Sequence, residues 1–143
     1  MNRMISPDKL NSPLCSVGLL RGRLSFVMQA IQGRRQDNAA HFRVNPRELD
    51  DLLAKAQETF SNLLKASYIL QTAMENIRSG EEDAFDIYLE DWAMSQTGEI
   101  LNSVAGFFRE LAAFSCDGLS FSPDLYEDGN QIIRQAMENG ELT

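Results

Sequence analysis

Apolar residues recur every three or four positions in three long stretches of the chain, which is the spacing of one face of an α-helix. The first stretch covers residues 13–32, and Gly33 is expected to end the helix as a C-terminal cap. Residues 33–45 are polar and irregular and are predicted to form a linker. Gly18 and Gly22 predict the close approach of another helix. The apolar stripe contains Leu14, Val17, Leu20, Leu24, Val27, Met28 and Ile31.

The second stretch carries the strongest signal. Residues 45–48 read Asn-Pro-Arg-Glu, which resembles a capping box at the start of a helix. Nine positions then follow at alternating steps of four and three, and such a repeat predicts a seam that faces a partner helix. Leu52, Leu64 and Tyr68 are expected to widen this seam, on a helix about 50 Å long. The nine positions are Leu49, Leu53, Ala56, Phe60, Leu63, Ser67, Leu70, Met74 and Ile77.

The third stretch begins in the acidic residues 81–83, where the helix dipole favours negative charge, and ends near Gly118. Its apolar stripe runs through Leu89, Trp92, Gln96 and Ile100, and the spacing becomes irregular around residues 95–98, which predicts a kink or break. A short last helix starts at either Pro123 or Asn130.

No strand-like alternation and no two-residue hairpin turn is found, so the predicted class is all-α. We expect one domain over residues 1–143, in which a long antiparallel helical hairpin (46–116) packs against an N-terminal helix (13–32) and a terminal helix (123–139) like a bundle. The long heptad seams also suggest a homodimer that completes a four-helix bundle.

Composition removes several classes of chemistry. The 143 residues include one His and two distant Cys, too few for the usual zinc sites, so we expect no metal and no cofactor. The cysteines are expected to be buried free thiols in a reducing cytosol. The first apolar run, residues 14–20, is interrupted and then closed by Arg21, which predicts neither a secretory signal nor a membrane span. We therefore expect a cytoplasmic protein.

Charge is unevenly distributed. Residues 1–47 hold eight Lys+Arg and two Asp+Glu, a net charge of +6, and the other residues hold five and nineteen, a net charge of −14. In one interpretation the basic segment neutralises the acidic remainder, within the fold or across a dimer. In a second, Arg34 and Arg35 contact nucleic acid or an acidic partner, although the acidic remainder repels phosphates. In a third, Glu82, Asp86 and Glu90, which share one helical face, occupy a basic site on another protein.

The sequence contains no phosphate-binding loop and no nucleophile motif, so we expect a protein that is not an enzyme. The favoured function is a helical protein–protein interaction module, a regulator or adaptor that acts through its acidic face and apolar seams. Phe108 is a candidate apolar contact, because it lies beside Phe107 and so leaves the main seam toward the terminal helix or another molecule. The alternatives are an acidic nucleic-acid mimic that inhibits a basic protein, a secretion chaperone, and a nucleic-acid binder.

Overall fold

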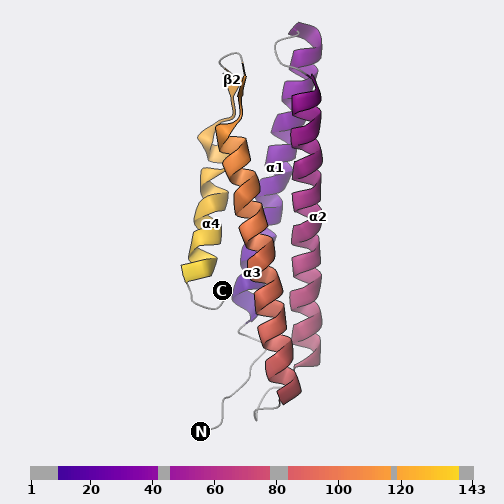
Figure 1. Cartoon of the computed structure of the whole chain (residues 1–143), viewed down its shortest axis with the longest axis vertical. Coiled ribbons are helices and arrows are strands. Elements are labelled where there is room, and N and C mark those ends of the chain that lie inside the picture. Colours follow the sequence, from indigo (N-terminus) through magenta and orange to yellow (C-terminus); the bar gives the residue numbers. More distant parts are fainter. Residues whose placement is uncertain (1–9, 42–45, 78–83, 117–118, 139–143) are drawn as a thin grey trace.

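Three long helices and one short helix form a bundle in the computed structural model, which describes residues 10–41, 46–77, 84–116 and 119–138 (Figure 1). The predicted all-α class is confirmed. The start expected at residues 81–83 lies outside the described residues. The elements are α1 (Asn11–His41), α2 (Pro46–Asn76), α3 (Ala84–Ala113), β1 (Ser115–Cys116), β2 (Leu119–Ser120), a 3₁₀ turn η2 (Pro123–Leu125) and α4 (Glu127–Glu138).

The second helix is a continuous rod with 31 residues, about 46 Å long at 1.5 Å per residue, as predicted. Its predicted stripe is buried or half-buried throughout, and α2 packs between α1 and α3. Leu64 and Tyr68 do not widen this stripe, since their exposed fractions are 41% and 70%. The stripe widens on its other side, which gives the helix a second apolar flank for its second neighbour. That flank repeats every seven residues at Leu52, Thr59, Ala66 and Ala73.

The first helix is longer than predicted, and the expected linker at 33–45 is wrong over its described part. α1 runs through Gly33 without interruption and ends at His41. A glycine inside a helix costs about 1 kcal/mol relative to alanine, so contacts beyond Gly33 must hold the helix together. The close approach of another helix that Gly18 and Gly22 allow does not occur within the bundle, because a Cβ atom at either position would have nothing within 4 Å.

The third helix is also unbroken, which corrects the predicted kink at residues 95–98. The buried row repeats at steps of four and three and includes two polar residues, Glu90 and Thr97. The stripe predicted from the sequence avoided these polar positions and instead included Leu89 and Trp92, which lie toward the surface. The apparent irregularity came from that shift between rows. The buried row is Glu90, Met94, Thr97, Leu101, Val104, Phe108 and Leu111.

Thr97 leads to a stability prediction. Its side chain is fully buried, and its hydroxyl has no hydrogen-bond partner among the residues that the structure describes. Because burying an unpaired hydroxyl is costly, we expect Thr97→Val to raise the free energy of unfolding by about 1 kcal/mol in urea titrations. The matched control is Thr59→Val, since the Thr59 hydroxyl donates to the Lys55 carbonyl oxygen at 2.7 Å. The control should gain no stability, and a loss of stability in Thr97→Val would contradict this interpretation.

The segment after α3 returns the chain toward α1. β1 and β2 pair with Ser115 opposite Ser120, so a two-residue connection joins them, and the expectation of no hairpin turn is wrong. The Asp117-Gly118 dipeptide is a known hairpin signal in sequences, but its residues lie outside the described part. α4 begins at Glu127, between the two predicted starts, after the 3₁₀ turn at Pro123. It packs against α1 and α3 through the buried residues Gly129, Ile133 and Ala136.

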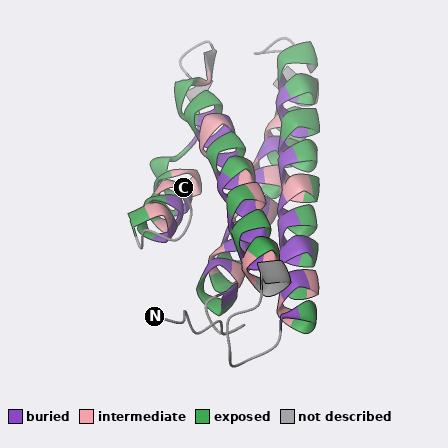
Figure 2. Ribbon diagram, turned by 60° about the horizontal axis from the view of Figure 1, so that its bottom comes forward, coloured by how far each residue is buried: buried purple, intermediate pink, exposed green. Residues whose placement is uncertain are grey.

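Buried positions line the inward faces of all four helices and exposed positions line their outer faces (Figure 2). Six large hydrophobic side chains depart from this pattern and remain exposed. Cys15 is exposed as a free thiol, which corrects the expectation that it is buried. The exposed large side chains are Leu19, Phe26, Leu64, Tyr68, Tyr88 and Trp92.

Candidate functional site

The predicted acidic face is not assembled as expected. Glu82 lies outside the described residues, and Asp86 lies in the first turn of α3, where its side chain is not described. Glu90 is only 4% exposed, because it belongs to the buried row of α3 and not to the solvent face. The prediction that Glu90 is a surface contact is therefore wrong.

The predicted basic contacts are engaged within the fold. The Arg34 guanidinium lies 4.8 Å from the centre of the Phe121 ring and donates a hydrogen bond to the Ser120 carbonyl oxygen. The Arg35 Nε lies 2.6 Å from Asp50 Oδ1. A third arginine of α1, Arg23, pairs with Asp128 of α4 at 3.0 Å. These contacts support the interpretation that the basic segment neutralises the acidic remainder within one chain.

Phe108, the predicted apolar contact, is a core residue. Its side chain is 0% exposed, and its ring fills the space where a Cβ atom at Gly129 would stand, with the nearest ring carbon at 2.5 Å. The ring therefore packs on the terminal helix, which was one of the two expected contacts. It is not available to another molecule.

Sequence reasoning missed a groove between α2 and α3. The two helices diverge toward the end where α2 begins and α3 finishes, as the two ribbon views agree (Figures 1 and 2). The groove holds two cavities, of about 450 and 370 Å³. The first is lined by Glu48, Asp51, Leu52, Lys55, Glu110, Ala113 and Phe114. The second is lined by Lys55, Glu58, Thr59, Asn62, Ser103, Gly106, Phe107 and Glu110.

The two cavities are successive repeats of one helical pattern. On α2, each lining residue of the second cavity follows a lining residue of the first by seven positions. On the α3 wall, Ser103, Gly106 and Phe107 each precede one by seven, and Glu110 lines both cavities. Seven residues of helix span about 10.5 Å, so the groove repeats itself at that distance. The sequence signal was the row Glu48, Asp51, Lys55 and Glu58 beside the apolar stripe, at steps of three, four and three.

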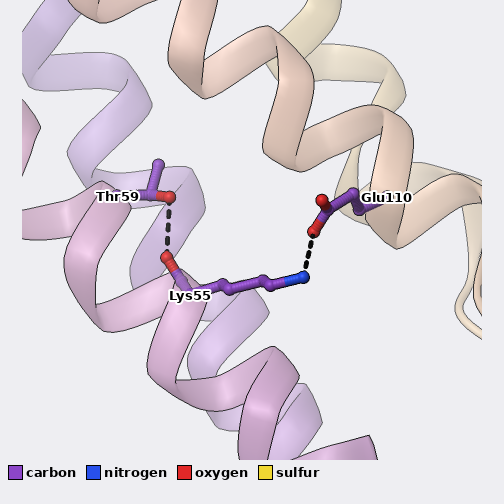
Figure 3. Close-up of polar contacts among 3 residues, drawn as sticks. All are labelled: Lys55, Thr59 and Glu110. Atoms are coloured by element: carbon purple, nitrogen blue, oxygen red, sulfur yellow. Dashed lines mark hydrogen bonds and ion pairs between the residues drawn. The ribbon is translucent and has the colours of Figure 1, made fainter.

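An ion pair crosses the groove where the cavities meet. The Lys55 side chain extends from α2, and its Nζ lies 3.1 Å from Glu110 Oε2 of α3 (Figure 3). Both side chains are about half exposed, so water and salt screen the pair and its contribution to stability is small. Four carboxylates and this one lysine line the groove, above a narrow apolar floor that includes Leu52 in the first cavity and Phe107 in the otherwise polar second cavity, each 5% exposed. The arrangement attracts cations and offers apolar contact.

No cluster of three or more metal-ligating side chains is found among the residues that the structure describes. Residues 11–37 form a helix that is long and apolar enough to cross a membrane, with a mean hydropathy of 1.2 and 28% of the apolar window buried. Core helices of soluble proteins and signal sequences have the same length and composition. Comparison with protein-family models, curated proteins and solved structures found no match.

Proposed function

We propose that this protein is a non-catalytic interaction module whose α2/α3 groove binds a basic amphipathic helix of a partner protein. The observation that carries the proposal is the repeated groove, with four carboxylates, one lysine and an apolar floor. Lysine and arginine side chains can bind both the apolar floor and the carboxylates of such a groove. Their methylene stems cover apolar surface while their charged ends reach carboxylates. The exposed thiol of Cys15 suits a reducing compartment, and we propose a cytoplasmic location.

The repeat of the groove favours a helical partner. A helix in a groove presents anchor residues at spacings of three, four and seven. Two basic residues seven positions apart lie about 10.5 Å apart on one helical face, which matches the distance between the cavities. One of them meets Glu48 and Asp51, and the other meets Glu58.

Binding of designed peptides tests the proposal. A 21-residue amphipathic helix with Lys pairs seven residues apart on one face should bind more tightly than a peptide of equal charge with those lysines on different faces. The double variant Asp51→Lys, Glu58→Lys should weaken binding at least tenfold, because it reverses the sign of the groove. Fluorescence anisotropy at two salt concentrations measures both effects, and the affinity of the original protein should fall as salt rises.

The matched control changes the same number of charges elsewhere. Glu75 and Glu99 are exposed and lie outside both cavities. The double variant Glu75→Lys, Glu99→Lys should therefore bind almost as the original protein does. Equal losses in the two double variants, or no peptide binding at all, would contradict the proposal.

The alternative functions have less support from the described residues than the groove has. Of the acidic face of a nucleic-acid mimic, Glu90 is buried, and the side chains of Glu82 and Asp86 lie outside the described residues. For a nucleic-acid binder, Arg34 and Arg35 both contact groups within the chain, although the Arg35 side chain is 45% exposed. We found no feature of the described residues that favours a secretion chaperone over the proposed module.

A further inference from the structure

The first helix carries two heptad seams, and only one is covered. The inner seam packs in the core. The outer seam also repeats at alternating steps of four and three, and every one of its residues is exposed. Its two large side chains, Leu19 and Phe26, have exposed fractions of 60% and 59%. The outer seam is Cys15, Leu19, Gly22, Phe26, Gln29 and Gly33.

The face that surrounds this seam is poor in charge. Between residues 11 and 33, all of which are described, the charged residues Arg21 and Arg23 are half-buried at the edges of the face, and Arg23 pairs with Asp128. The solvent side of α2 is different. Its exposed residues include Arg47, Glu48, Asp50, Asp51, Lys55, Glu58, Lys65 and Glu75. A charge-poor, partly apolar face about 34 Å long on an acidic protein is typical of a surface that another molecule covers.

We propose that the outer seam of α1 binds the outer seam of a second copy in a two-fold, antiparallel pair. A seam with a seven-residue repeat matches another helix with the same repeat. Two copies with a net charge of −8 each repel one another, so they associate most readily through a face that is poor in charge and holds no exposed carboxylate. The seam also complements itself when it is reversed. It then places Phe26 opposite Gly22, Leu19 opposite Gln29 and Cys15 opposite Gly33.

The glycines provide the space that this pairing needs. A Cβ atom at Gly18, Gly22 or Gly33 would have nothing within 4 Å, so a partner's side chain can approach the backbone. The same three glycines weaken α1 by about 1 kcal/mol each and gain nothing within one chain. Close approach at glycine therefore occurs between two copies, not between α1 and its own bundle.

The oligomeric state tests this inference independently of the groove. Light scattering after size exclusion should give about twice the chain mass of 16.1 kDa when the protein is loaded at roughly 50–100 μM. Leu19→Glu and Phe26→Glu should each give the monomer mass, because each should raise the dissociation constant of the dimer at least 100-fold. Ser95→Glu, an exposed position on α3, is the matched control and should remain a dimer. Circular dichroism should show unchanged helix content in all three variants.

Two outcomes overturn the inference. One is that the original protein is a monomer, because the outer seam then faces solvent. A monomer that floats with zwitterionic vesicles counts in the same way, because the outer seam then faces a membrane. The other is a dimer that survives both glutamate substitutions, because the interface then lies elsewhere.

Disulfide formation tests the direction of pairing. In the antiparallel pair the two Cys15 residues lie about 27 Å apart along the helix axis, so they cannot join. In a Cys116→Ser background, Gly33→Cys should give a covalent dimer under mild oxidation, because position 33 lies opposite Cys15 of the other copy. Cys15 alone should not. A covalent dimer through Cys15 alone would show parallel chains and overturn this arrangement.

Discussion

Phe108→Ala is expected to lower the free energy of unfolding by about 3–5 kcal/mol, the usual cost of removing a fully buried phenylalanine. The side chain is 0% exposed, its ring centre lies 6.0 Å from that of Phe107, and it packs directly on Gly129. The loss of the ring leaves a cavity at the point where α4 joins the bundle. Urea unfolding followed by circular dichroism measures the change. Tyr88→Ala on the same helix is the control, because its side chain is 64% exposed, and it should change stability by less than about 0.5 kcal/mol.

The contact between Phe108 and Gly129 adds a second test to the same prediction. Gly129→Ala should destabilise the protein by about 1–3 kcal/mol, because the new Cβ atom overlaps the ring. In a Phe108→Leu background the ring is absent, and Gly129→Ala should then be neutral or gain up to about 1 kcal/mol from helix propensity. Additive effects of the two substitutions would contradict the close contact.

This contact also explains why a glycine stands near the start of α4, at a position that reads as a helix breaker in the sequence. Because of Gly129, Asn130 was one of the two predicted starts of the last helix. The helix α4 in fact begins at Glu127, two residues before Gly129. Glycine is needed at this position because the Phe108 ring of α3 packs against its backbone. Phe108 is close to Gly129 in space but distant from it in the sequence. No local pattern around residue 129 contains that information.

The long helices were predictable because their apolar spacing is a local property. The heptad stripe of α2 predicted both its length and its buried face. The row of α3 was harder to find, because Glu90 and Thr97 occupy core positions while Trp92 lies at the surface. Hydrophobicity alone selects Trp92 over Thr97, and only the packing of the neighbouring helices reverses that choice.

The end of α1 was not predictable from nearby residues. Gly33 and the polar residues that follow it are typical of a linker. In the helix this segment contacts other elements: Arg35 pairs with Asp50, and Arg34 lies over the ring of Phe121, more than eighty residues away. The two arginines therefore contact acidic and aromatic groups of the same chain, whereas a linker would leave them in solvent.

Predicting the candidate groove from the sequence requires both the lining of α2 and its register with α3, and no single helix contains the second. The acidic row on α2 was visible in the sequence, but its partner wall on α3 depended on the register between the helices. That register is shown by Lys55 and Glu110, which meet across the groove. The densest acidic run, residues 81–91, drew attention instead, and the structure buries one of its members, Glu90.

The two proposals together predict a bivalent binder. The groove lies between α2 and α3, whereas the outer seam lies on α1, which is behind those two helices in Figure 1. A dimer formed through the seam therefore leaves both grooves open. Two binding sites on one particle raise the affinity for a linked pair of ligands without any new contact.

A tandem peptide, in which two basic helices are joined by a Gly/Ser linker, should thus bind about 10²–10⁴ times more tightly than a single helix. Linkers of roughly 10 to 40 residues cover the separations that a flexible chain reaches, with a maximum gain at one length. The monomeric variant Leu19→Glu should bind the single helix normally and lose this gain, because its groove is unchanged. A tandem peptide that gains equally on the original protein and on Leu19→Glu would show that the gain does not come from paired copies.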